Sequence, residues 1–216
     1  ASPVLHYSLE VFEGLKAYQY DNGEVGLFRP ELNCERLNTS AERMCLPPID
    51  AVLQLEAIET LVDLERGWVP KSPGTSLYIR PTMIGDGCRL GICKAQKYIY
   101  YIICSPSGSF YPRGIQPLRI HIEDAYVRAV AGGTGCVKTG GNYASSLLAA
   151  TNAKQRGYDQ VLWLDGRENR YIEEVGAMNV MFVLDGVLTT PAINGSILDG
   201  ITRRSVLTLA RSMDLP

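Results

Sequence analysis

Lys138 is the residue with the clearest chemical potential in this 216-residue chain. It lies in the segment 132–143, GGTGCVKTGGNY, where five glycines surround a single lysine. A lysine amine can act as a nucleophile, and glycines beside it leave room for a flat partner. The alternative is a surface lysine in a glycine loop, the usual environment of lysine. A P-loop is excluded, because Val137 stands where that motif requires glycine.

Two adjacent carboxylates, Glu173 and Glu174, follow a strand-like run further along the chain. We expect one of them to be directed inward, and the sequence leaves open which one. A solvated acidic pair is the alternative interpretation. A lysine nucleophile, a distant carboxylate and a glycine-lined approach are together what a pyridoxal 5'-phosphate enzyme requires. The amine forms a Schiff base, and the carboxylate keeps the ring nitrogen protonated so that the ring accepts electrons.

Other residues are suited to anions or to apolar groups. A helix that opens at Gly200-Ile201-Thr202 offers backbone N–H groups and a hydroxyl to a phosphate, although a helix start without a ligand fits equally well. Arg29 lies at a strand–helix junction, and Arg80 lies inside an apolar strand, where it is either structural or binds an anion. Four aromatic residues line a pocket or belong to the core. They are Tyr7, Phe12, Tyr78 and Phe110.

The first half of the chain is predicted to combine short strands with two helices. Asp21-Asn22-Gly23 tolerates positive φ and predicts a hairpin, and Asp50 is suited to cap a helix. The expected elements are strands at 15–20, 24–28, 76–83 and 96–104, and helices at 31–45 and 51–66. The buried side of the second helix is expected to consist of Val52, Leu53, Leu55, Ile58, Leu61, Val62 and Leu64.

A stretch rich in serine, proline and glycine, 105–114, predicts a linker. We therefore expect an α+β fold with a small domain at 1–107, an interdomain linker at 108–114 and a large domain with the lysine at 115–216. In the second domain we expect strands at 118–123, 160–164, 170–172, 180–184 and 187–190, and helices at 143–156 and from 201 onward.

The composition excludes several classes of function. The formal charge is −2 with no basic run, which argues against nucleic acid as a partner. The longest apolar run is too short to span a membrane. Six cysteines without a C-x-x-C pair, and only two histidines, argue against a metal site. Scattered cysteines of this kind predict reduced, mostly buried thiols in a cytoplasmic protein.

The chain closely resembles branched-chain amino-acid aminotransferases, which belong to fold type IV of the pyridoxal-phosphate enzymes. The matching blocks follow the family's order over nearly the whole chain, and the glycine loop and the Glu-Val-Gly-x-Met-Asn block are the most specific. The blocks are LHYSLEVFEGLKAY, LFRPELNCERL, SLYIRP, GCVKTGGNYASSLLA, QVLWLDG, YIEEVGAMNVMFV and GSILDGITRRSV. The resemblance implies a two-domain fold truncated at both termini here, because the family's first and last segments have no counterpart.

The resemblance also implies roles for individual residues. Lys138 corresponds to the catalytic lysine, which carries the cofactor and moves the proton. The implied cofactor-binding residues are Arg29 and Ile201 with Thr202 for the phosphate, Tyr143 for the ring hydroxyl, and Glu174, rather than Glu173, for the ring nitrogen. The implied substrate-binding residues are Phe12, Tyr78, Arg80, Phe110 and Ala177, with Tyr7 lent by a partner subunit. Ala177 replaces a hydroxyl residue, and Phe110 a tyrosine, of some relatives.

The implied reaction is reversible transfer of the amino group of leucine, isoleucine or valine to 2-oxoglutarate, giving branched-chain 2-oxo acids and glutamate. Its place would be amino-acid biosynthesis in the cytoplasm, by a homodimer. Two alternatives of the same fold group stay open, a D-amino-acid aminotransferase and an aminodeoxychorismate lyase. An alternative of another class is a non-catalytic fragment.

Overall fold

The computed structural model describes residues 1–109, 114 and 116–216. The chain divides into two compact units, Ala1–Gln116 and Pro117–Pro216. Each unit combines helices with a sheet, as expected for an α+β fold. The two units are described separately below, and the domain limits inferred from the sequence stay a prediction.

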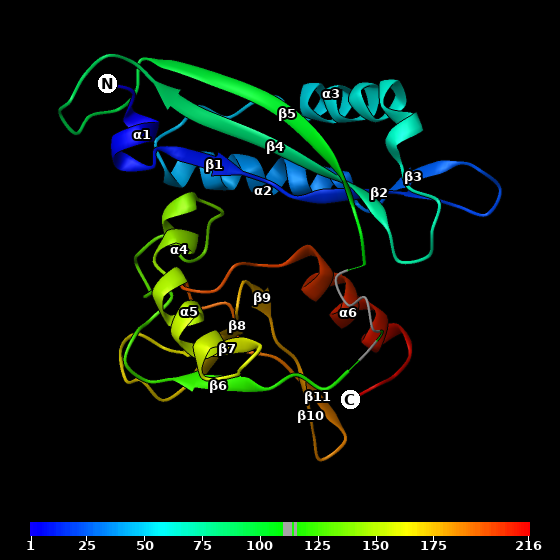
Figure 1. The fold of residues 1–216 in the computed structure, drawn as a ribbon, viewed down its shortest axis with the longest axis vertical. Helices are drawn as coiled ribbons and strands as arrows, with labels where there is room; N and C mark the ends of the chain where they lie inside the picture. The colour runs from blue at the N-terminus through cyan, green and yellow to red at the C-terminus, as the bar shows by residue number, and fades with distance from the viewer. Residues whose placement is uncertain (110–113, 115) are drawn as a thin grey trace. The chain divides into compact units, whose positions relative to one another are not determined.

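The first unit is built on an antiparallel sheet (Figure 1). Its strands run in the order β1-β4-β2-β3, and β5 pairs with β4 along its whole length. The predicted hairpin is confirmed, since β2 pairs with β3 on either side of Asp21-Asn22-Gly23. The strands are β1 Glu10–Phe12, β2 Leu15–Gln19, β3 Val25–Leu27, β4 Ser76–Asp86 and β5 Lys97–Ser107.

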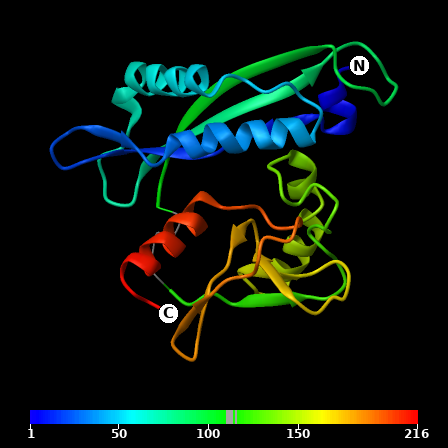
Figure 2. The same cartoon turned by 180° about the vertical axis from the view of Figure 1, so that it is seen from behind.

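Two helices, α2 (Pro30–Arg43) and α3 (Ala51–Leu64), cover one face of this sheet, as Figure 2 shows from behind. Asp50 is confirmed as the N-cap of α3, since its side chain accepts a hydrogen bond from Leu53 N–H. Alternate β4 side chains pack against the helices, which leaves Tyr78 and Arg80 on the other face. Two buried clusters form the core of this unit. One consists of Leu15, Ala17, Cys34, Ile58, Val62, Val69, Leu77 and Ile79, and the other of Val11, Leu37, Ala41, Leu46 and Met83. Short helices complete the unit, α1 (Pro3–Tyr7) and a 3-10 turn at Arg66–Trp68.

The predicted buried side of α3 is wrong for three residues. Val52, Leu53 and Leu64 are exposed, whereas Gln54, Ile58 and Val62 are buried. A helix with 3.6 residues per turn can present only one stripe to the sheet, and here that stripe repeats every fourth residue. Gln54 is accommodated because its amide donates to the Ile49 carbonyl.

The second unit contains a four-stranded sheet in the order β6-β7-β8-β9 and a separate hairpin of β10 and β11. Strand β6 runs parallel to β7, and the other pairs are antiparallel. The β7–β8 register shifts by one residue beside Trp163, and Glu173 has no partner in it. The strands are β6 Ile120–Glu123, β7 Gln160–Leu164, β8 Ile172–Val175, β9 Met178–Asn179, β10 Phe182–Leu184 and β11 Val187–Thr189.

Helix α6 (Ile201–Ser212) begins as predicted, with Gly200 as its N-cap. The single helix predicted at 143–156 is instead two helices, α4 (Gly140–Ala144) and α5 (Leu147–Gln155). The break has a local cause. The hydroxyls of Ser145 and Ser146 donate to the carbonyls of Asn142 and Tyr143, and serine side chains that bond to nearby backbone compete with a continuous helix.

The strand predicted at 170–172 is shifted, because β8 starts at Ile172 and continues through both glutamates. Arg170 and Tyr171 belong to a turn instead. Their N–H groups donate to Oδ1 of Asp165, whose Oδ2 accepts the N–H groups of two more residues in the same turn. Asp165 therefore organises the β7–β8 connection and delays the start of the strand.

The expectation of mostly buried cysteines is wrong. Only Cys34 is buried, since the short loops that carry Cys45, Cys88 and Cys93 leave them exposed and two others are half-buried. Within the described part of the chain, no helix has the length and apolar character needed to cross a membrane. No group of three potential metal ligands occurs among the same residues.

Candidate active site

Lys138 and Tyr143 lie together at the start of α4. The lysine Nζ donates to the tyrosine hydroxyl over 2.7 Å, and both side chains are half-buried. The loop between the glycines is held by Asn142, whose amide donates to the carbonyls of Thr134 and Val137. A buried amide with two backbone acceptors fixes the path of the chain. The lysine is therefore presented from a defined loop.

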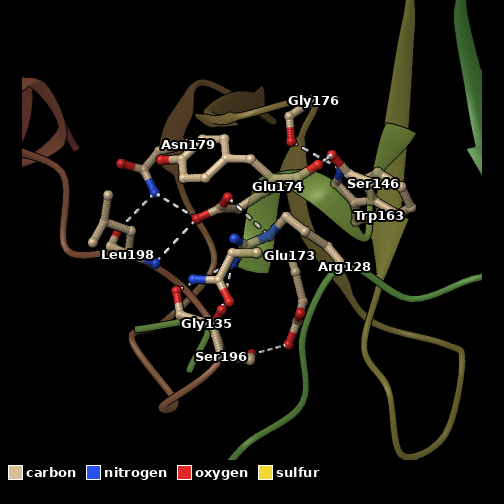
Figure 3. Close-up of polar contacts among 12 residues, drawn as sticks. Arg128, Gly135, Ser146, Trp163, Glu173, Glu174, Gly176, Asn179, Ser196 and Leu198 are labelled. Atoms are coloured by element: carbon tan, nitrogen blue, oxygen red, sulfur yellow. Dashed lines mark hydrogen bonds and ion pairs between the residues drawn. The ribbon is translucent and has the colours of Figure 1, made fainter. Parts of the chain in front are cut away.

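Glu174 is a buried carboxylate on β8, with 3% of its surface exposed. Its Oε2 lies 3.1 Å from Nε of Arg128 in an ion pair, and its Oε1 accepts the Leu198 N–H at 3.1 Å (Figure 3). The Asn179 amide donates to the same oxygen over 3.4 Å and to the Leu198 carbonyl over 2.9 Å. These contacts bring together segments that are far apart in the sequence.

Burial raises the pKa of Glu174 above its usual value, and the charge of Glu173 raises it further. Three groups oppose this shift, namely the Arg128 cation, the Leu198 N–H and the Lys138 amine. The net pKa remains raised, because desolvation outweighs the stabilisation of the charged form. A further cation near Glu174 would therefore stabilise the carboxylate form of this side chain.

The structure brings several predicted residues of the second unit to one small cavity. Tyr143, Glu174 and Ala177 line it, together with Arg128 and Asn179. The cavity thus collects a phenol, a carboxylate and a guanidinium. Ile201 and Thr202 form the first turn of α6, three residues beyond the Leu198 amide that binds Glu174.

The expectation that one of two neighbouring glutamates is directed inward needs correction, since both are buried. Glu173 is 3% exposed and its Oε1 accepts hydrogen bonds from Ser196 and Asn194. Glu174 alone lines the cavity. Glu174 is paired with Trp163 in the ladder, whereas Glu173 is the unpaired residue at the register shift, and the 194–198 segment contacts both side chains.

In the first unit, Phe12, Tyr78 and Arg80 form one cluster on the face of the sheet opposite the helices. The Arg80 guanidinium carbon lies 4.5 Å from the Phe12 ring centre and 5.1 Å from that of Tyr78. Its Nη2 donates to the Tyr78 hydroxyl over 2.8 Å. Its buried Nε makes no hydrogen bond within the described residues, so this nitrogen can still donate to an anion.

The structure describes two further predicted residues of the first unit, Tyr7 and Arg29. Tyr7 ends α1, and its hydroxyl donates to the Leu90 carbonyl. Arg29 is exposed and precedes α2 with a left-handed φ of 52°. That backbone conformation is unusual for arginine and is often found at binding sites. Phe110 lies outside the described residues.

Four residues of the site were not anticipated from the sequence. Arg128, Ser196 and Leu198 lie in segments without regular structure, so no periodic pattern marks them. Asn179 belongs to the Glu-Val-Gly-x-Met-Asn block, and its spacing of five residues from Glu174 was the available signal.

The sequence and the fold correspond to a known family. The model of the family described as Amino-transferase class IV matches residues 10–216, and the chain belongs to that family. The chain is also 54% identical over 217 residues to "Branched-chain-amino-acid transaminase 1" of Bacillus subtilis (strain 168), covering all of this chain and 61% of that protein. It is 52% identical over 215 residues to "Branched-chain-amino-acid aminotransferase 2" of the same organism, covering 59% of it.

Solved structures give the same relationship. A branched-chain aminotransferase of the archaeon Thermoproteus uzoniensis, crystallised with norvaline, matches with a TM-score of 0.83 and 30% identity, covering all of this chain and 69% of that one. The T.th. branched-chain amino acid aminotransferase complexed with N-(5'-phosphopyridoxyl)-L-glutamate matches with a TM-score of 0.82 and 29% identity, covering 98% and 67%. The chain spans about three fifths of the length of the curated relatives it matches.

Proposed function

We propose that this protein catalyses reversible transfer of an amino group from leucine, isoleucine or valine to 2-oxoglutarate, with pyridoxal 5'-phosphate as cofactor. The observation that carries the proposal is the pairing of Lys138 with Tyr143 within the same unit as the buried, cavity-lining Glu174. The printed names of the relatives support the substrate class. The glutamate and 2-oxoglutarate half of the reaction rests on Arg80 alone.

The residues present fit the cofactor. Lys138 offers an amine, and a Cβ at Gly141 would meet open space, so the glycines leave room near the amine. Helix α6 starts at Gly200 without a side-chain cap, which leaves N–H groups for a phosphate beside Ile201 and Thr202. We propose that Arg29 adds a guanidinium to that phosphate.

When bound, pyridoxal phosphate supplies a ring that accepts electrons from the bond broken at the substrate α-carbon. Glu174 as an anion would hold a proton on the ring nitrogen, because a positive charge beside it would favour its carboxylate form. Lys138 Nζ carries the proton to and from the α-carbon, and the Tyr143 hydroxyl keeps that amine in place. Arg128 forms an ion pair with Oε2 of Glu174, whereas the Leu198 N–H donates to Oε1.

Two kinds of substrate must be accepted. We propose that Phe12 and Tyr78 contact the apolar side chain of leucine. The family resemblance assigns Ala177 and Phe110 to the substrate as well. Arg80 stays stacked between Phe12 and Tyr78 while leucine is bound, and its remaining N–H groups pair with the distal carboxylate of glutamate. Tyr7 is assigned to the site of a partner subunit in a homodimer.

The test uses the full-length protein with added pyridoxal phosphate and a panel of amino donors. Lys138→Ala removes both the nucleophile and the proton carrier, so turnover of leucine should fall at least about 10³-fold with folding retained. Loss of the protein-linked absorbance of the cofactor in the same variant checks the assignment. Lys154→Ala, at an exposed lysine of α5, is the matched control. A donor preference for D-alanine, or lyase activity, would replace the proposed substrate class.

A further inference from the structure

Glu173 is a buried carboxylate that the proposed reaction does not use. Its Oε1 accepts hydrogen bonds from the Ser196 hydroxyl and, at 3.2 Å, from the Asn194 amide. Its Oε2 is buried without a hydrogen bond, and no ion pair to Glu173 occurs within the described ranges. An incompletely paired buried carboxylate costs free energy, so its environment calls for a functional reason.

The segment Asn194–Leu198, named here the glutamate loop, contacts both glutamates. Ser196 binds Glu173 through its hydroxyl, and Leu198 binds Glu174 through its N–H over 3.1 Å. The glutamate loop also packs closely against Gly135. A Cβ at Gly135 would lie 2.2 Å from the Ser196 carbonyl oxygen, so only glycine permits this approach.

Ser196 also connects to the cation that pairs with Glu174. Its carbonyl accepts a hydrogen bond from Nη2 of Arg128, while Nε of the same guanidinium lies 3.1 Å from Glu174 (Figure 3). Ser196 is therefore connected to Glu174 in two ways, by its hydrogen bond to Arg128 and by the backbone that continues to Leu198. Both connections end on groups that stabilise the charged form of Glu174.

We propose that Glu173 is a positioning residue for Glu174, and that it acts by holding Ser196 and thereby the glutamate loop. The inference rests on the proposed function, since it gives Glu174 its role. Holding Ser196 keeps Arg128 and the Leu198 N–H directed at Glu174. The alternative is a direct effect of the Glu173 charge, and that effect has the opposite sign, because a nearby anion disfavours a second anion.

The opposite signs make the two effects separable by titration. The charged groups that face Glu174 are Arg128, Lys138 and Glu173. Ser196→Ala changes none of these charges. It removes the hydroxyl, and with it the contacts to Glu173 and to Oδ1 of Asn194 in the same loop. If the loop is held by the link to Glu173, Arg128 and the Leu198 N–H lose part of their contact with Glu174. The pKa of Glu174 should then rise by about half a unit to one unit, the equivalent of one net hydrogen bond.

The measurement is a carbon-13 NMR titration of the Glu174 carboxyl in the full-length protein without cofactor, assigned with Glu174→Gln. Ser196→Thr, which keeps the hydroxyl, should restore the original value, and Ser212→Ala, an exposed serine of α6, should leave it unchanged. Ser196→Cys has a slightly larger side chain with a weaker donor, so the pKa of Glu174 should rise by less than in the alanine variant. It replaces Ser196→Ala if that variant does not fold. An unchanged or lowered Glu174 pKa in Ser196→Ala and Ser196→Cys overturns the proposal.

The two variants of Glu173 provide a second check. Glu173→Gln retains an acceptor for Ser196 and loses the charge, so the pKa of Glu174 should fall. Glu173→Ala loses both the acceptor and the charge. When it is combined with Ser196→Ala, the change in the pKa of Glu174 should differ from the sum of the two separate changes, because both variants break the same link. Additive effects would mean that the residues act independently. Because these titrations need neither cofactor nor turnover, failure of the positioning role is distinct from failure of the proposed reaction.

Discussion

Each unit of this protein buries one glutamate against an arginine, and the two pairs differ in how completely they are satisfied. Glu13 of the first unit is fully buried between β1 and β2. Its two oxygens accept from Nε and Nη2 of Arg36 at 2.7 and 2.9 Å, and further from the Asn33 amide at 2.7 Å and the Gly14 N–H at 3.1 Å.

Glu174 of the second unit has longer and fewer contacts. Its ion pair with Arg128 spans 3.1 Å, and Nε of that arginine does not align as a hydrogen-bond donor. The carboxylate of Glu174 lines a cavity together with Tyr143 and Arg128. A carboxylate in a bidentate pair that also accepts further hydrogen bonds holds elements together. A carboxylate that keeps spare capacity towards a cavity is suited to a ligand.

The first prediction concerns the more completely hydrogen-bonded pair, Glu13 and Arg36. Glu13→Ala removes the carboxylate that forms the ion pair with the mostly buried Arg36 guanidinium, and it removes one acceptor of the Asn33 amide. The free energy of unfolding of the full-length protein should fall by about 3–5 kcal/mol, as expected for a broken buried ion pair. Chemical denaturation measures it. A loss below about 1 kcal/mol would remove the structural role from Glu13.

The second prediction concerns the less completely hydrogen-bonded pair, Glu174 and Arg128. Glu174→Gln keeps the shape of the side chain but cannot hold a proton on the cofactor ring as an anion. The turnover number for leucine should fall by about 10²–10³-fold, equivalent to about 2.7–4 kcal/mol, with a smaller loss of stability than in Glu13→Ala. Glu173→Gln is the matched control and should lose much less. Steady-state kinetics showing the reverse order would exchange the roles of the two glutamates.

The third prediction concerns Arg80, which resembles Glu174 in keeping unused hydrogen-bonding capacity. Arg80→Gln should weaken the half-reaction with glutamate far more than that with leucine. A lost charge-assisted hydrogen bond is worth about 1.5–3 kcal/mol, or roughly ten- to hundredfold in the ratio of the two rates. Single-turnover rates with each donor measure that ratio. Equal losses would make Arg80 structural, like Arg36.

The smallest effect is expected at Asp165, a carboxylate whose two oxygens each accept two hydrogen bonds and which is not deeply buried. Four backbone N–H groups bind it, and those of Tyr171 and Glu168 contribute most to holding its pKa well below the usual range. Because its pKa in the folded state is lowered, its contribution to stability is present above the unfolded pKa and is lost as the pH falls. Thermal unfolding of Asp165→Asn should show a modest loss at neutral pH that disappears in acid. A loss of equal size in acid would contradict this origin.

The sequence predicted those parts of the fold that depend on neighbouring residues. The Asp21-Asn22-Gly23 turn, the Asp50 cap and the start of α6 at Gly200 are each set by a few adjacent side chains and were found correctly. The strand at 170–172 was misplaced, because the hydrogen bonds of Asp165 reach five and six residues along the chain. The split between α4 and α5 depends on hydroxyl orientation, which residue types alone do not fix.

Partners that are distant in the sequence could not be predicted. Arg128 and Leu198 reach Glu174 from 46 residues before it and 24 residues after it, and neither lies in a periodic pattern. The family resemblance identified Lys138, Tyr143 and Glu174 as a set, and the structure places Tyr143 and Glu174 at one cavity. Their roles, and those of Arg29, Tyr7 and Phe110, stay predictions until the variants are measured.

The shift in register between β7 and β8 makes this site sensitive to chain length. Trp163 is paired with Glu174, but Leu164 is paired with Ile172, so Glu173 is an additional residue in the ladder. Such a residue is retained because the bulge redirects its neighbours. Deleting Glu173 would restore regular pairing, because Ile172 and Glu174 already lie opposite Leu164 and Trp163. A homologue that has lost this residue could thus keep Lys138, Tyr143 and Glu174 and still present no carboxylate to Ser196.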